Sequence, residues 1–305
     1  MAWQNCLLLA SHTRLPDCVV QGKLKRMTKH PFDQALALEP AGADRPDTFI
    51  GHTSPAYWNM VGPFGGSTAA TALQAVLQHP ALLGEPVSLT VNYAAATSEG
   101  AFSITATPVR TNRSTQHWVI SLSQADDKGN EQVAMTATAM TALRRDTWHL
   151  NDMPMPQVAK PQDVPRADMR GAMEWLSRYE MRFARGPIPT EWHGDEKRSP
   201  DSVTQIWVRD DVPRVLDFTS IAAMADVFYP RIWLRRPVRV PGGTVSMTTY
   251  FHASAAQLKE VGTGYVLAQG QGQAFRHGFF DQAAQLWSED GTLLVTSHQL
   301  VYFKE

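Results

Sequence analysis

A buried helix in the second half of the chain is the clearest prediction from the pattern of apolar positions. Four of them follow the i, i+3, i+4, i+7 spacing of one helical face: Ile221, Met224, Ala225 and Phe228. Asp217 can cap the first turn, and Pro230 is expected to end the helix. The only charge inside it is Asp226. Because an unpaired buried carboxylate is costly, Asp226 is either a hydrogen-bonded structural acid or the working group of a site.

A second helix is predicted over residues 64–80, earlier in the chain. Its apolar face is formed by Ala69, Leu73, Val76 and Leu77. Gly65 and Gly66 open this helix, Ser67 is expected to cap it, and Pro80 stops it. Glycines allow another group to approach the backbone closely at a helix start, where free N–H groups point outward.

Each predicted helix is followed by four runs typical of β-strands. They cover residues 86–96, 101–111, 116–123 and 132–143 in the first half, and residues 243–253, 264–274, 279–288 and 292–303 in the second. Two more strand-like runs, 178–183 and 203–209, precede the second helix. The order of elements is therefore duplicated. A helix followed by an antiparallel sheet that can wrap it predicts an α+β fold, repeated twice.

Composition divides the chain further. Four prolines between residues 144 and 165 indicate a linker, so we place the first unit at 29–145, the linker at 146–170 and the second unit at 171–305. Residues 1–28 show no clear periodicity and are expected to form an extension outside the compact core.

Charge and cysteine usage exclude several functional classes. A net charge of −1 argues against nucleic-acid binding, which needs a concentrated basic face. No apolar run approaches the roughly 20 residues of a membrane span. The two cysteines, Cys6 and Cys18, form no disulfide framework and favour a cytoplasmic location. The ten histidines are dispersed, so neither a metal site nor a cofactor is predicted. A homo-oligomer is left open.

Several motifs resemble those of the double hotdog acyl-CoA thioesterases. These motifs lie at residues 64–66, 206–209, 243–252 and 290–299. Asp226, Thr244 and Gln299 match, in order, the Asp/Thr/Gln constellation of the type II (TesB-like) acyl-CoA thioesterases. The resemblance implies a double hotdog fold, in which two tandem helix-plus-sheet units form one extended sheet. It also implies an acyl-CoA substrate that is hydrolysed by direct attack of water.

The residues fit that chemistry. A carboxylate on a buried helix can take a proton from water, and burial raises its pKa toward a useful range. The hydroxyl of Thr244 and the amide of Gln299 can hold the same water, and the N–H groups of Gly65 and Gly66 are candidate oxyanion donors. The chain contains no G-x-S-x-G motif for a covalent route. The first helix has no acid and residues 133–143 have no glutamine, which predicts one centre per chain.

Alternative interpretations stay open. Thr244 and Gln299 can be ordinary strand residues, and the fold can belong to an acyl-binding protein that lacks turnover. A hotdog hydratase would need an Asp/His pair, and the second helix contains no histidine. A basic run, Arg231 to Arg239, can meet the phosphates of coenzyme A, although arginines in such loops more often face solvent.

Overall fold

A computed structural model describes residues 29–126, 128–192, 198–236 and 238–304. The predicted N-terminal extension and both cysteines lie outside these described residues.

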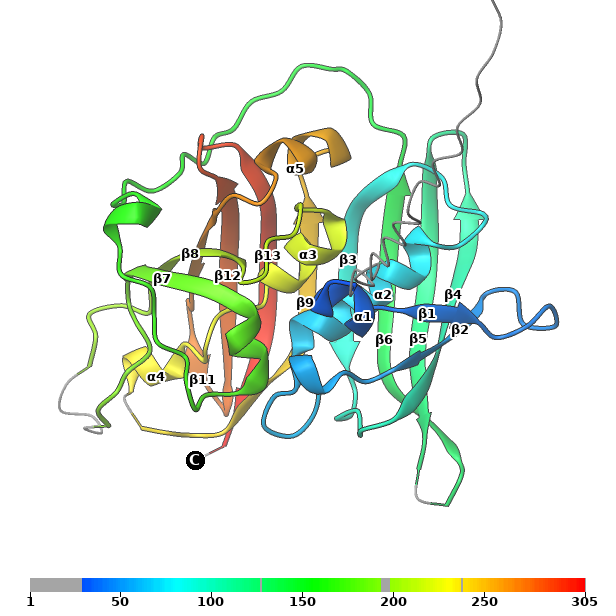
Figure 1. Ribbon diagram of the computed structural model, residues 1–305, viewed down its shortest axis with the longest axis horizontal. Helices are drawn as coiled ribbons and strands as arrows, with labels where there is room; N and C mark the ends of the chain where they lie inside the picture. The colour runs from blue at the N-terminus through cyan, green and yellow to red at the C-terminus, as the bar shows by residue number, and fades with distance from the viewer. Residues whose placement is uncertain (1–28, 127, 193–197, 237, 305) are drawn as a thin grey trace, which may run out of the picture.

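A single antiparallel sheet runs through the molecule (Figure 1). Its strands in the first half are β1 (Leu38–Pro40), β2 (Thr48–His52), β3 (Glu85–Tyr93), β4 (Ala101–Thr111), β5 (Thr115–Ala125) and β6 (Glu131–Ala142). Those in the second half are β7 (Tyr179–Arg185), β8 (Thr204–Asp210), β9 (Gly242–Phe251), β10 (Val266–Gln271), β11 (Phe275–Arg276), β12 (Phe279–Ser288) and β13 (Leu293–Phe303). The spatial order is β1-β2-β4-β5-β6-β3-β9-β13-β12-β10-β8-β7, with β11 paired to β12. The predicted α+β architecture of two units in one extended sheet is confirmed.

The helices lie on one face of this sheet. They are α1 (Pro31–Ala35), α2 (Gly65–Leu77), α3 (Phe218–Met224), α4 (Ile232–Arg235) and α5 (Ala255–Val261), with the 3₁₀ turns η1 (Pro55–Tyr57) and η3 (Glu174–Arg178). A third 3₁₀ turn, η2 (Pro161–Asp163), lies in the linker. The two central helices, α2 and α3, pack against each other across the junction of the units (Figure 1). Their apolar faces belong to one hydrophobic core, in which Leu73, Val76 and Ile221 are fully buried.

Two details of the predicted helices are wrong. Ser67 does not cap α2, because Phe64 occupies the cap position and the Ser67 hydroxyl donates to the Phe64 carbonyl (2.6 Å). The second helix starts where expected, with Asp217 accepting from the Ser220 N–H (2.8 Å) in a capping box, but it ends at Met224. The N–H of Asp226 donates to the carbonyl of Ala223 (3.1 Å), which tightens the last turn. Asp226 therefore lies in the turn just after α3 and not in the interior of a helix.

The two units are joined where β3 pairs with β9. Five residue pairs, from Ser88↔Tyr250 to Asn92↔Ser246, make this seam continuous. Arg144, at the end of the first unit, donates to the carbonyl oxygens of Pro86 (2.7 Å) and Phe251 (2.9 Å), one from each unit. The side-by-side docking of the sheets thus has both strand pairing and a bridging side chain.

Part of the linker packs on the outer face of the sheet. Met155, Val158 and Val164 contact an apolar cluster formed by Trp207, Tyr265, Leu267 and Trp287. The indole N–H of Trp207 donates to the carbonyl of Ala159 (2.8 Å). This segment therefore covers a hydrophobic surface in addition to connecting the units.

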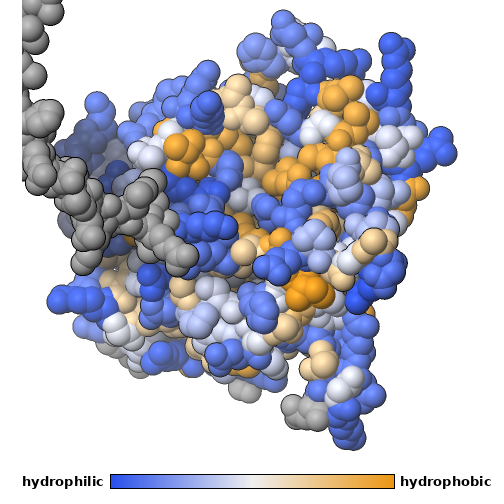
Figure 2. Space-filling view, turned by 45° about the vertical axis from the view of Figure 1, so that its right-hand side comes forward, coloured by the Kyte–Doolittle hydropathy of each residue, from blue (hydrophilic) through white to orange (hydrophobic). Residues whose placement is uncertain are grey.

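Elsewhere the surface alternates between polar and apolar side chains. Figure 2 shows apolar groups in separate patches between polar ones on the face that it presents. Scattered exposed apolar residues are normal on a soluble monomer, so this face does not by itself indicate a partner. The homo-oligomer stays a prediction. None of the helices in the described residues is long and apolar enough to cross a membrane.

The seam leads to a prediction about the isolated second unit. Residues 167–305 expressed alone should aggregate or dimerise, because β9 would become an unpaired edge that can template further strand pairing. Size-exclusion chromatography with light scattering measures the outcome, and the full chain is the control. A stable, monodisperse monomer would contradict the role given to the β3–β9 seam.

Candidate active site

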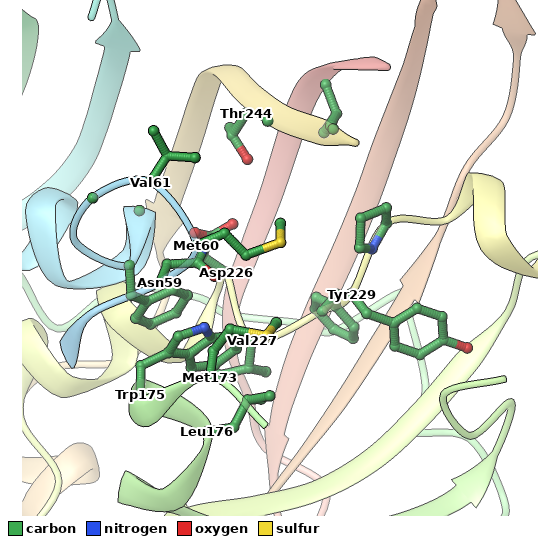
Figure 3. Close-up of a pocket in the computed structure, with 18 of the residues that line it drawn as sticks. Asn59, Met60, Val61, Met173, Trp175, Leu176, Asp226, Val227, Tyr229 and Thr244 are labelled. Carbon is green, nitrogen blue, oxygen red and sulfur yellow. The ribbon is translucent and has the colours of Figure 1, made fainter. Parts of the chain in front are cut away.

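A cavity of about 930 Å³ lies where the two units meet. The first unit lines it with residues 59–65 and 93–97, and the second with residues 226–230 and 242–244. Figure 3 shows Met173, Trp175 and Leu176 on one side of Asp226, and Val61 and Thr244 on the other. The walls are mostly apolar and aromatic, which suits a ligand with a hydrophobic group.

Asp226 is the buried acid of this cavity, with an exposed fraction of 9%. Its Oδ1 accepts a hydrogen bond from Gln299 Nε2 (2.8 Å), and the backbone N–H of Gly66 is directed at the same carboxylate. Burial raises the pKa of Asp226 from 3.8 to about 7, although the contacts with Gln299 and Gly66 act in the opposite direction. The group can therefore exchange a proton near neutral pH.

Thr244 reaches the site through an irregularity in the sheet. Opposite residues on β9 and β13 include Met247↔Gln299 and Ser246↔Leu300, but the register shifts next and Thr244 pairs with Val301. Strict alternation from buried Met247 would turn Thr244 to the outer face. Because the bulge adds one residue on β9, Thr244 faces inward and its Oγ1 donates to Gln299 Oε1 (3.4 Å).

Gln299 connects the other two residues. Its amide nitrogen donates to Asp226 and its amide oxygen accepts from Thr244. It is 4% exposed, so it is not the exposed strand residue of the alternative interpretation. The structure thus brings Asp226, Thr244 and Gln299 together from the turn after α3, from β9 and from β13.

The start of α2 closes the site from the first unit. A Cβ atom on Gly65 would lie 2.7 Å from Asp226 Oδ2, so only glycine leaves the carboxylate in its place. A Cβ on Gly66 would lie 2.5 Å from the backbone oxygen of Ala223 in α3. The two glycines therefore let α2 approach both the acid and the helix that carries it. Among the described residues, no acceptor takes the N–H of Gly65, which lines the cavity.

Two residues beside the site were missed in the sequence. The Tyr93 hydroxyl donates to the carbonyl of Gly65 (2.9 Å), and the pKa of Tyr93 is raised by burial and by the charge of Asp226. Met247 contacts the Gln299 amide through sulfur (3.3 Å). Neither belongs to a recognisable motif, because their roles depend on which strands become neighbours.

The basic run after α3 divides into different environments. Arg231 is fully buried and donates to the carbonyls of Tyr229 and Ser202, and Arg235 donates to the carbonyl of Ser199. Arg239 is exposed and lines the cavity. The expectation that such arginines face solvent is therefore wrong for Arg231. No group of three or more His, Cys, Asp or Glu side chains that could hold a metal ion occurs in the part of the chain that the structure describes.

Comparisons with known proteins agree with this architecture. Residues 54–142 match the family model of the acyl-CoA thioesterase N-terminal domain, and residues 154–303 match that of the C-terminal domain. A search of curated proteins finds no match.

Solved structures give the same picture. A conserved protein of unknown function with the hot dog fold from Alicyclobacillus acidocaldarius is 42% identical, with a TM-score of 0.83 over 91% of this chain and 99% of its own. A candidate thioesterase II from Thermobifida fusca YX is 18% identical (TM-score 0.72, 90% and 97% covered). An acyl-CoA thioesterase II from Mycobacterium marinum is 15% identical (TM-score 0.66, 90% and 98% covered). The first of these structures shares the hot dog fold, and the two family models, each on its own unit, establish that the chain belongs to the double hotdog acyl-CoA thioesterase family.

Proposed function

We propose that this protein hydrolyses acyl-CoA thioesters to the free acid and coenzyme A. The observation that carries the proposal is the convergence of Asp226, Gln299 and Thr244 beside the start of α2, inside a largely apolar cavity. Membership of the acyl-CoA thioesterase family supports the substrate class.

In this mechanism Asp226 is the general base. It accepts a proton from a water molecule while the water oxygen attacks the thioester carbonyl carbon. The C–S bond then breaks, and the proton passes from Asp226 to the departing thiolate. Water thus supplies a hydroxyl group to the acyl carbon and a proton to sulfur, and no external reagent is needed.

The other polar groups position the reactants. Gln299 holds Oδ1 of Asp226 by its amide N–H, and Thr244 fixes the orientation of that amide. The hydroxyl of Thr244 lies on the cavity side, where it can also hold the attacking water. The unpartnered N–H of Gly65 is placed to stabilise the oxyanion, whereas the N–H of Gly66 is directed at Asp226.

Two other functions fit the residues less well. An Asp/His hydratase would need a histidine at the acid, and none of the described residues that line the cavity is a histidine. An acyl-binding protein without turnover gains no advantage from a carboxylate with a pKa near neutrality, because burying it costs stability.

The proposal is tested by measuring free thiol released from acyl-CoAs of graded chain length. We expect catalytic release with at least one member of the series, and a rise in kcat/KM as methylenes enter the apolar wall region. Saturable binding of every member without thiol release would favour the acyl-binding alternative.

The proposed base makes a prediction for pH dependence. A general base works when it is deprotonated, so kcat/KM should rise with pH through about 7, the pKa of Asp226, and then level off. Asp210 offers a matched control, because burial raises its pKa to about 7 as well, and it does not line the cavity. The Asp210→Asn variant should keep the rise of kcat/KM near pH 7. If Asp210→Asn abolished the rise of kcat/KM with pH, the rise would report Asp210 and not Asp226.

A further inference from the structure

The peptide group that joins Gly65 to Gly66 is held at both of its polar ends. Its carbonyl oxygen, on Gly65, accepts a hydrogen bond from the Tyr93 hydroxyl (2.9 Å). Its N–H, on Gly66, is directed at the carboxylate of Asp226. Because a trans peptide group is planar, its C=O and N–H point in opposite directions and can only turn together. The tyrosine and the proposed base are therefore linked through one rigid group.

Tyr93 reaches this peptide group from the last position of β3. It follows the buried residues Leu89 and Val91 on the same face of the strand, so its side chain faces the helices. The next two backbone N–H groups along the chain both donate to the carbonyl of Ala134 (2.9 and 3.0 Å), which fixes the end of the strand. The ring of Tyr93 lines the cavity, while its hydroxyl is turned toward α2.

The phenol of Tyr93 is suited to hold a group in place and not to transfer a proton. Burial, and after it the charge of Asp226, raise the pKa of Tyr93 well above its ordinary value. Tyr93 therefore stays a neutral hydrogen-bond donor throughout the pH range in which Asp226 titrates. A Cβ atom on Gly65 would lie 3.6 Å from the Tyr93 hydroxyl and 2.7 Å from Asp226 Oδ2, so both side chains lie against the same glycine.

We propose that Tyr93 is a positioning residue of the active site, which holds the peptide group between Gly65 and Gly66 so that the Gly66 N–H stays directed at Asp226. This inference rests on the proposed function. A donor at the carbonyl oxygen also polarises the peptide group and thereby strengthens its N–H as a donor. The first unit thus acts on the acid of the second through one hydroxyl and one peptide group.

Few titratable groups act on the Asp226 carboxylate. Tyr93 on β3 and Tyr179 on β7 both sense its charge, and Arg239 is the other charged side chain among the described residues that line the cavity. No charged side chain of the described residues contributes to the raised pKa of Asp226, which is set by burial and by two hydrogen bonds. A change in the hydrogen bond from Gly66 should therefore be visible in the pKa of Asp226.

Tyr93→Phe removes the hydroxyl and keeps the ring that lines the cavity. Without its partner the peptide group can turn, and the contact of the Gly66 N–H with Asp226 weakens. Because that contact favours the charged carboxylate, the pKa of Asp226 should increase, and the rise of kcat/KM should move to higher pH. On the high-pH plateau kcat should fall by roughly fivefold, the loss typical of one neutral hydrogen bond, with KM near that of the parent.

Tyr179→Phe is the matched control. The Tyr179 hydroxyl is buried, has no hydrogen-bond partner among the described residues, and senses the charge of Asp226. Both variants remove one phenol oxygen near the acid, but only Tyr93 contacts the peptide group. The pKa of Asp226 and kcat should therefore keep their parent values in Tyr179→Phe. An equal shift in both variants would be an effect of lost polarity, and it would overturn the inference.

A carbon-13 NMR titration makes the test independent of turnover. With the aspartate carboxyl carbons labelled, the signal of Asp226 is identified by its absence in Asp226→Asn, and its pKa is read directly. A higher Asp226 pKa in Tyr93→Phe than in the parent and in Tyr179→Phe supports the inference. That holds even if the parent hydrolyses no thioester, a result that would overturn the proposed function alone. An Asp226 pKa that is unchanged or lower in Tyr93→Phe overturns the inference, whatever the effect on kcat.

Discussion

Replacing Asp226 with Asn should lower thioesterase activity by roughly 10²–10⁴-fold, the contribution typical of a positioned general base. Asn is nearly isosteric with Asp and can still accept the hydrogen bond from Gln299 Nε2. It cannot take a proton from water. The loss should therefore appear in kcat with acyl-CoA, measured as thiol release under saturating substrate.

Stability measurements distinguish this result from unfolding. The pKa of Asp226 in the folded protein, about 7, lies above its ordinary value of 3.8, so the cost of burying the charge grows as pH rises between these values. At pH 8.5 the Asn variant should consequently melt at or above the temperature of the parent, and this advantage should be lost at pH 4. If the Asn variant has the melting temperature of the parent and hydrolyses acyl-CoA at the parent rate, Asp226 is a structural acid and not the general base.

The neighbours of Asp226 provide the comparison series. Thr244→Val and Gln299→Ala should each reduce turnover less than Asp226→Asn, because they position groups without accepting the proton. Losses in the double variants should be smaller than the product of the single losses, since the three side chains form one hydrogen-bonded unit.

Gly65→Ala should reduce kcat by roughly 10²-fold, because displacing a catalytic group by about 1 Å can slow a reaction by that factor. The new Cβ would lie 2.7 Å from Asp226 Oδ2, so the carboxylate must move from its position beside Gln299. The nearest atoms after that belong to Tyr93 at 3.6 Å, an ordinary contact. Because the close atom is the end of a side chain and not backbone, the strain can be relieved locally and the melting temperature should change little.

Gly66→Ala is the contrasting variant in the same turn. Its Cβ would lie 2.5 Å from both the backbone oxygen of Ala223 and the ring of Phe64, so α2 and α3 must separate. Overpacking of this kind costs about 1–3 kcal/mol, which should lower the melting temperature by several degrees. If Gly65→Ala also lowers the melting temperature, or keeps full activity, the position of the Asp226 carboxylate does not depend on its close approach to Gly65.

The fold was readable from the sequence where burial alternates cleanly. The strands predicted at residues 101–111 and 279–288 match β4 and β12 in both bounds. The end of α3 was not readable, because the apolar positions continue through Val227 and Phe228 after the backbone has left the helix. The spacing of apolar residues indicates burial. It does not reveal the tightened turn that ends the helix before Asp226.

Other features of the structure had only weak patterns in the sequence, or patterns that were overlooked. The short helix α5 was missed although Ser254 and Gln257 form a capping box, a spacing that the sequence does contain. The inward orientation of Thr244 could not be derived from strand periodicity, since the bulge beside Val301 reverses it. Asp226 stood out as the only charge in the predicted buried helix. Thr244 and Gln299 were selected through family resemblance, because residues on three separate elements have no common local pattern.

The strand pairing between β3 and β9 has a consequence for how the site behaves on dilution. Gly66 and Asp226 come from different units, yet one polypeptide carries both. In an assembly of two separate hotdog chains, a site shared in this way would dissociate at low protein concentration. Here the partner strand is always present at a high effective concentration, so we expect the specific activity to be independent of protein concentration. The covalent link also frees the two helices to differ, with α2 supplying backbone N–H groups and α3 supplying the acid.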